Sequence, residues 1–160
     1  MSWCVPSSSP PTGSSAEGCV GPCYLVCKYR LRLEHCEDCL FDAGGEGSAA
    51  RFLYQVFGSQ YRELIGALYY DIRQQLLGYA VHHIGTLSRA SVEPCSFFAA
   101  ALLVNAASMR LFHFHPSGCL DPSLDDRRFT RRMEQCGELL GVPVEEHLIL
   151  GHHGQFARVE

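Results

Sequence analysis

The residues best suited to chemistry in this sequence lie in one short stretch, HFHPSGCLDPSLDD, which spans residues 113–126. It begins with His113 and His115, which flank a single phenylalanine. If residues 109–115 form a strand, both imidazoles point to the same face, because side chains alternate along a strand. Their Cα atoms would then lie about 6.5–7 Å apart, a separation at which two histidines can bind one metal ion.

An acidic residue, Asp126, lies on the helix that we expect to begin with Asp121 as its N-cap and Pro122 as its first residue. Ser123, one turn earlier, points in nearly the same direction and could donate a hydrogen bond into the same pocket. The face of Asp126 is otherwise apolar, and a carboxylate there needs a partner because burying an unpaired charge is costly. A metal ion held by the two histidines would supply that partner. The residues expected on this inward face are Phe129, Thr130, Met133, Cys136 and Leu140.

Two histidines and one aspartate give a zinc ion three protein ligands and leave its fourth position to water. Zinc lowers the pKa of such a water to about 7, which makes it a nucleophile at neutral pH if a general base lies close by. Glu63 is the candidate base. It begins an otherwise apolar stretch, ELIGALYYD, where a carboxylate has little structural reason to be.

The elements that must position these groups alternate between strands and helices. The apolar patterns predict strands at 63–71, 76–85, 109–115 and 142–151, and helices at 48–57, 94–107 and 122–140. Ser48 is the expected N-cap of the first helix, and Gly141 is the expected end of the last. The first two strands are joined by a short link, so they should pair antiparallel. We therefore expect an α/β (α+β) fold with one sheet and helices on its faces.

The first 46 residues differ in composition from the rest. They are rich in Ser, Pro, Gly and Cys, and we expect them to have little order apart from an edge strand within residues 23–33. We place the domain at residues 47–160. A second zinc ion bound by the cysteines of the extension is the alternative, although only the last two have typical ligand spacing. These cysteines are Cys19, Cys23, Cys27, Cys36 and Cys39.

The bulk composition limits the classes of protein that this chain could belong to. The 160 residues are 47% hydrophobic and 19% charged, which is typical of one globular domain with its own core. The net charge of −4 argues against a generally basic nucleic-acid binder. We find no apolar run long enough to span a bilayer and no signal peptide, so we expect a cytoplasmic protein without a membrane partner. Nine cysteines, an odd number, favour free thiols or metal ligands over a disulfide framework.

Glu63, His113, His115, Ser123 and Asp126 together match the pattern Glu…His-x-His-x7-Ser-x2-Asp, which is the metal-site motif of the JAMM (MPN/JAB) superfamily. More narrowly, FHFHPSGCLDPSLDD resembles the RadC-like JAB branch, whose signature is His-Asn-His-Pro-Ser-Gly followed by Pro-Ser and an Asp. The segments ELIGALYYD, IGTL and GELLGVPVEEHLILG are also similar to that branch. The resemblance covers residues 48–152.

This resemblance implies an MPN-type fold, a mixed sheet sandwiched by helices. It implies one Zn²⁺ per chain on His113, His115 and Asp126, with Glu63 as the base that activates water and Ser123 as an oxyanion donor. The implied activity is that of a zinc metallopeptidase acting on a peptide or isopeptide bond in a peptide or protein substrate. The chain departs from the branch at Phe114, and also at residues 93–96, EPCS, where the family has a His-Pro-Arg-Glu-like stretch. We find no N-terminal helix-hairpin-helix, and we expect the domain to be truncated at its C-terminus.

The alternative function is a non-catalytic, metal-stabilised module that acts near DNA, as the DNA-repair label of the family suggests. Four arginines on the last helix would form its nucleic-acid face, although such a face is more often simply solvated. Glu63 separates the two functions, because a pure binding module does not need it. The sequence does not specify an oligomeric state. The four arginines are Arg127, Arg128, Arg131 and Arg132.

Overall fold

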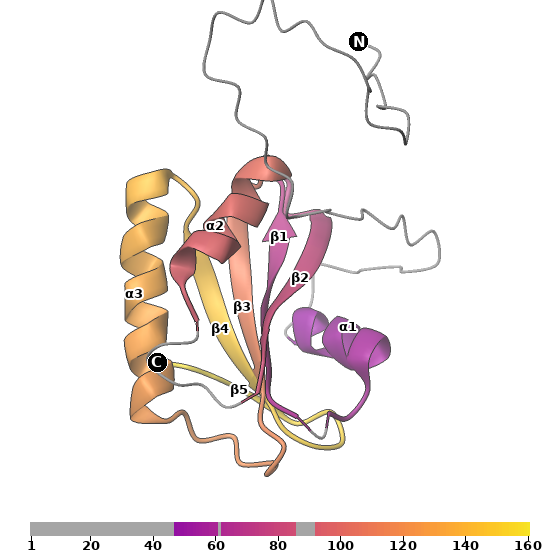
Figure 1. Ribbon diagram of the computed structural model, residues 1–160. Coiled ribbons are helices and arrows are strands. Elements are labelled where there is room, and N and C mark those ends of the chain that lie inside the picture. Colours follow the sequence, from indigo (N-terminus) through magenta and orange to yellow (C-terminus); the bar gives the residue numbers. More distant parts are fainter. Residues whose placement is uncertain (1–46, 61, 86–91) are drawn as a thin grey trace, which may run out of the picture. The chain divides into compact units, whose positions relative to one another are not determined.

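A five-stranded mixed sheet forms the centre of the domain (Figure 1). The structure is a computed structural model that describes residues 47–60, 62–85 and 92–160. The sheet order is β2-β1-β3-β4-β5, and every neighbouring pair is antiparallel except β3 and β4. The strands are β1 (Leu64–Tyr70), β2 (Leu76–Ile84), β3 (Ser108–Phe114), β4 (Val144–Leu150) and β5 (Phe156–Arg158). The helices are α1 (Ser48–Phe57), α2 (Pro94–Leu103) and α3 (Leu124–Leu140).

Helices cover both faces of this sheet, which confirms the expected mixed sheet sandwiched by helices. Helix α1 packs on one face and α2 and α3 lie on the other, as Figure 1 shows. The two faces have separate apolar cores. Phe114 belongs to the core on the α1 side, where its ring makes edge contacts with Tyr54 and Phe57. The phenylalanine between the two histidines therefore points away from them, as its position in the strand predicts.

Strand β1 is buried along its whole length, as the apolar run ELIGALYYD predicts for a strand covered on both faces. Gly66 is required at its centre. A Cβ there would collide with the carbonyl oxygen of Ala80 and with the ring of Phe112. The close approach lets β1 pack between β2 and β3, in a register that places Leu64 opposite Phe114.

One expected end of each of the three helices was wrong. Gly47, in the left-handed region at φ 73°, precedes α1, and Ser48 is its first helical residue. Ser123, not Asp121, is the N-cap of α3, because its hydroxyl accepts a hydrogen bond from Asp126 N–H. Helix α2 ends at Leu103, earlier than expected. The expected C-terminus of α3 at Gly141 is confirmed, since that glycine adopts the left-handed conformation at φ 71°.

Two further details differ from the sequence-based expectation. Strand β5, which pairs antiparallel with β4, was missed because three residues are too few to give a periodic signal. Leu140 is 48% exposed rather than buried, since the last turn of α3 carries it away from the core. The predicted extension 1–46, with its strand and its cysteines, lies outside the described residues. Within the described ranges, none of the helices is long and apolar enough to cross a membrane.

Candidate metal centre

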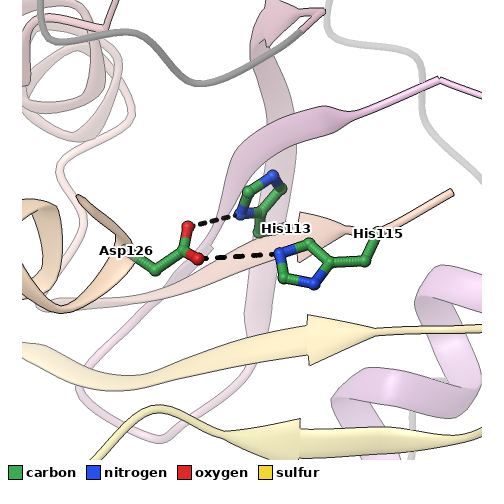
Figure 2. Close-up of side chains that lie close together, drawn as sticks. All are labelled: His113, His115 and Asp126. Carbon is green, nitrogen blue, oxygen red and sulfur yellow. Dashed lines mark hydrogen bonds and ion pairs between the residues drawn. The ribbon is translucent and has the colours of Figure 1, made fainter. Parts of the chain in front are cut away.

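Three side chains from two consecutive elements and the loop between them converge at one end of the sheet (Figure 2). His113 lies near the end of β3, His115 lies just beyond it, and Asp126 belongs to the first turn of α3. Each offers one nitrogen or oxygen atom, and these atoms all lie within 4.8 Å of one another. The group could hold a metal ion. It consists of the two histidines and the aspartate that the sequence singled out.

The two imidazoles approach opposite oxygens of the same carboxylate. His113 Nδ1 lies 2.9 Å from Asp126 Oδ1, and His115 Nε2 lies 3.7 Å from Asp126 Oδ2. The two rings are perpendicular, with centroids 4.5 Å apart. His113 and Asp126 are 3% and 2% exposed and His115 is 13% exposed, so the site opens to solvent on the side of His115.

The hydrogen-bond partners of His115 leave its Nε2 lone pair available to bind a cation. Its Nδ1 lies 2.7 Å from the carbonyl oxygen of Cys119, which can only accept, so Nδ1 carries the hydrogen. In the neutral ring the Nε2 lone pair then faces the Asp126 carboxylate across 3.7 Å. Two acceptors at that distance make no hydrogen bond with each other, whereas an ion between them can be bound by both.

His113 also fits the same group of ligands. Its Nε2 is buried and has no hydrogen-bond partner in the structure, although its Nδ1 contacts Asp126. Buried nitrogens are normally paired, so an orphaned one on a candidate ligand indicates a site that is incomplete without a further group. The nitrogen and oxygen donors suit zinc and other transition metals better than magnesium or calcium, which prefer oxygen ligands alone.

Asp126 owes its position to the start of helix α3. It forms a capping box with Ser123: the Ser123 hydroxyl accepts from Asp126 N–H at 3.1 Å, and Asp126 Oδ2 accepts from Ser123 N–H at 2.8 Å. The same hydroxyl donates its own hydrogen to Oδ2 at 2.6 Å. Two negative residues in the first turn, Asp125 and Asp126, also match the positive end of the helix dipole.

These contacts keep the carboxylate ionised. Burial alone would raise the pKa of Asp126, but the contacts with His113, His115 and Ser123 outweigh it and hold the pKa well below its usual value. Asp126 in turn raises the pKa of His115 more than partial burial lowers it. The centre therefore presents a permanent negative charge beneath two imidazoles, which is the electrostatic arrangement that attracts a cation.

A cleft of about 590 Å³ opens over this centre, and Glu63 and Ser123 line it beside the three candidate ligands. Glu63 immediately precedes β1, is half-buried, and contributes to the raised pKa of His115. The structure therefore brings together all five residues of the predicted motif. The remaining residues that line the cleft are Pro116, Ser117, Cys119, Asp121 and Asp125.

The four arginines of the predicted nucleic-acid face lie outside this cleft. Arg127 donates to the carbonyl oxygen of Glu160, Arg128 pairs with Asp125 at 3.3 Å, and Arg132 pairs with Glu93 at 3.0 Å. Arg131 is exposed. Three of the four guanidinium groups are therefore engaged with oxygens of the domain itself.

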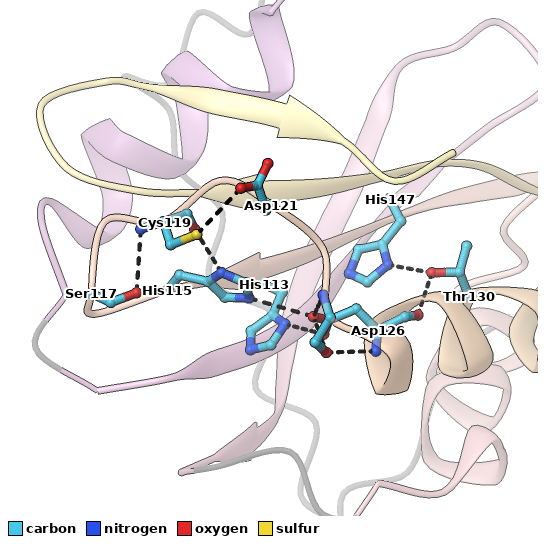
Figure 3. Close-up of polar contacts among 9 residues, drawn as sticks. His113, His115, Ser117, Cys119, Asp121, Asp126, Thr130 and His147 are labelled. Atoms are coloured by element: carbon cyan, nitrogen blue, oxygen red, sulfur yellow. Dashed lines mark hydrogen bonds and ion pairs between the residues drawn. The ribbon is translucent and has the colours of Figure 1, made fainter.

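Two buried polar residues next to the centre were not singled out from the sequence as site residues. His147, on β4, is 1% exposed, and its Nδ1 lies 2.7 Å from the hydroxyl oxygen of Thr130 on α3. Figure 3 shows this pair beside Asp126. The signal was present in VEEHLIL, where a histidine begins the buried half of a strand. It was missed because a lone histidine in a strand has no spacing pattern.

The RadC-like JAB domain family matches residues 45–159 of the chain. Among curated relatives, a UPF0758 protein of Latilactobacillus sakei subsp. sakei is 31% identical over 128 residues, which is 79% of this chain and 57% of the relative. A UPF0758 protein of Thermotoga maritima is 34% identical over 96 residues, 60% of this chain and 43% of the relative. Another, of Pseudomonas fluorescens, is 39% identical over 89 residues, 56% of this chain and 40% of the relative. The chain spans about half the length of the curated relatives it matches.

Proposed function

This chain belongs to the RadC-like JAB domain family, and from that membership and its His113–His115–Asp126 centre we propose that it is a zinc-dependent hydrolase of JAMM type. The proposed substrate is a peptide or protein, cleaved at a peptide or isopeptide bond. One Zn²⁺ per chain would be held by His113, His115 and Asp126. When bound, the ion supplies Lewis acidity, which lowers the pKa of a coordinated water to about 7 and polarises the substrate carbonyl.

The observation that carries this proposal is the position of Glu63. A site that only holds a metal needs its ligands, but here a further half-buried carboxylate, that of Glu63, lines the same cleft without belonging to the ligand group. We assign Glu63 as the general base. It accepts a proton from the attacking water and returns it to the leaving amine, so that an amide and one water become a carboxylate and a protonated amine.

Ser123 is the proposed oxyanion donor, and its hydroxyl has two uses in this fold. In the structure it donates to Asp126 Oδ2 at 2.6 Å. Stabilising the oxygen of the tetrahedral intermediate requires that hydrogen to turn from Asp126 toward the substrate. Donors of this kind lower the barrier by a few kcal/mol, about 3–4 in a well-measured case.

The test of this function is the purified full chain, prepared without added metal and then loaded with zinc. The proposal expects about one zinc per chain by elemental analysis, and cleavage of peptide or isopeptide substrates that a chelator stops and zinc restores. A folded chain that takes up no zinc would refute the metal centre. A chain that binds zinc but cleaves none of these substrates would favour the non-catalytic module instead.

A further inference from the structure

His147 lies deep beneath the metal centre, in a place where the proposed chemistry does not use it. It belongs to β4, which pairs in parallel with β3, and its ring stacks on that of His113 with centroids 6.4 Å apart and planes 14° from parallel. The ring of Phe129 from α3 meets it edge-on at 6.1 Å. His147 itself is almost completely buried, with 1% of its surface exposed.

The hydrogen bonds around Thr130 determine which nitrogen of His147 carries the hydrogen. The Thr130 hydroxyl donates to the backbone carbonyl of Asp126 at 2.8 Å. It has only one hydrogen, so its 2.7 Å contact with His147 is a bond in which Nδ1–H donates to the hydroxyl oxygen. A continuous chain of hydrogen bonds thus runs from β4 through Thr130 to Asp126 (Figure 3).

This series of hydrogen bonds leaves one buried nitrogen unpaired, and that penalty argues against a purely structural role for His147. With the hydrogen on Nδ1, the Nε2 of His147 is left buried without a hydrogen-bond partner. An unpartnered nitrogen in the core destabilises the fold, and an apolar residue of similar size would avoid that penalty. What an apolar residue cannot supply is the donor to Thr130.

We propose that His147, acting through Thr130, is a positioning residue that holds Asp126 and His113 in the arrangement needed to bind one metal ion. Its ring packs against the ring of His113. Its Nδ1–H donates to the Thr130 hydroxyl, which in turn donates to the backbone carbonyl of Asp126 in the first turn of α3. Strand β4 thereby ties together the two elements that present the ligands. This inference rests on the proposed metal function of the centre. Residues that orient ligands in this way commonly change metal affinity by 10–100-fold when they are replaced.

The experiment compares zinc dissociation constants in the full chain, measured by competition with a chromophoric chelator. His147→Leu and Thr130→Val remove the hydrogen bond and roughly keep the volume, so each should weaken zinc binding 10–100-fold. The double variant should weaken zinc binding no more than the stronger single variant, because both changes remove the same hydrogen bond between His147 and Thr130. Thr130→Ser retains the hydroxyl and should bind zinc within about 3-fold of the wild type, as should the core control Met133→Leu.

A second readout distinguishes positioning from general loosening of the core. The visible spectrum of the cobalt-substituted protein reports ligand geometry, and it should change in Thr130→Val but not in Thr130→Ser. Wild-type zinc affinity and an unchanged cobalt spectrum in folded Thr130→Val would overturn the positioning role and leave the metal centre standing. A folded wild-type chain that binds no zinc would instead overturn the proposed function, and the positioning role with it.

Discussion

His113 and Asp126 lie 2.9 Å apart, Nδ1 to Oδ1, and both side chains are almost completely buried. One comes from the end of a central strand and the other from the first turn of a helix that starts ten residues after that strand ends. Ser123 hydrogen-bonds to the Asp126 carboxylate in the capping box, and the Thr130 hydroxyl donates to the backbone carbonyl of Asp126. Contacts within the fold itself therefore hold the two side chains together.

Glu63→Gln removes the proposed base and keeps nearly the same shape. Because Glu63 is not a ligand, zinc content should stay at about one per chain, while kcat/KM should fall about 10²–10⁴-fold. Elemental analysis and steady-state kinetics measure the two quantities separately. Glu138→Gln, an exposed change on α3, is the control for charge. Full turnover in Glu63→Gln would eliminate this mechanism.

Zinc should stabilise the fold by binding only the native chain. At a free zinc concentration 100 times the dissociation constant, the free energy of unfolding should rise by about 2.7 kcal/mol. Urea denaturation with and without zinc measures this difference. His113→Ala should remove it, whereas His153→Asn, an exposed histidine at φ 53° where asparagine is tolerated, should retain it. An equal zinc effect in His113→Ala would place the ion elsewhere.

Ser123→Ala should affect stability and catalysis together. Losing the N-cap of α3 should lower the free energy of unfolding by about 1 kcal/mol, within a usual range of about 0.5–2. Losing the oxyanion donor should also lower kcat by about 10²-fold or more. Ser123→Thr keeps a hydroxyl for both tasks and is the matched control. A wild-type kcat in Ser123→Ala would show that Ser123 only caps helix α3 and has no catalytic role.

Acid should destabilise the domain in part through His82. Burial against Phe97, where its Nε2 contacts the hydroxyl of Tyr69, lowers the pKa of His82 to about 4. In the unfolded chain this pKa is near 6.5. The unfolded state therefore binds more protons between these two values, so the stabilising contribution present above pH 6.5 is lost as the pH falls toward 4.

The measurement is urea denaturation at several values between pH 7 and 4.5 for the wild type and for His82→Leu. Replacing His82 should make the loss of stability across this window shallower. His153→Asn is again the control, because it replaces a histidine whose side chain is exposed. Identical pH profiles for the wild type and His82→Leu would show that His82 takes up its proton as readily in the folded chain as in the unfolded chain.

The nucleic-acid alternative is tested by Arg128→Glu combined with Arg131→Glu. If α3 contacts phosphates, this change should weaken DNA binding and reduce its dependence on salt. Fluorescence anisotropy at two salt concentrations measures both effects. Arg51→Glu combined with Arg73→Glu, two exposed positions away from α3, changes the net charge by the same amount and is the control. DNA binding that is absent at low salt, or that the double change leaves unaltered, would reject this alternative.

The sequence predicted the centre well because its signals are local. The spacing of His113 and His115 follows from the alternation of a strand, and the separation of Ser123 from Asp126 follows from one helical turn. The order of elements from α1 to β4 was equally clear from their apolar periods. The arrangement of the strands required the resemblance to a known family, since nothing local in β3 or β4 specifies that they pair in parallel.

The sequence was less informative where a contact depends on the packed core. His147 lies seventeen positions after Thr130 along the chain, and the two residues meet only when β4 packs against α3. The cap of α3 was misplaced because Asp121-Pro122 and Ser123 both match the residue preferences of a helix start. The hydrogen bonds of the capping box, visible only in three dimensions, decide between them.

The capping box has a consequence for how sequences of this family can be interpreted. Asp126 serves the folding of α3 as well as any ion, so selection for a stable helix would preserve it even in a chain that had lost its reaction. Its presence in a relative is therefore weak evidence that the relative is active. Position 63, together with the residues at 113 and 115, is the more informative place to look when active members of the family are to be separated from inactive ones.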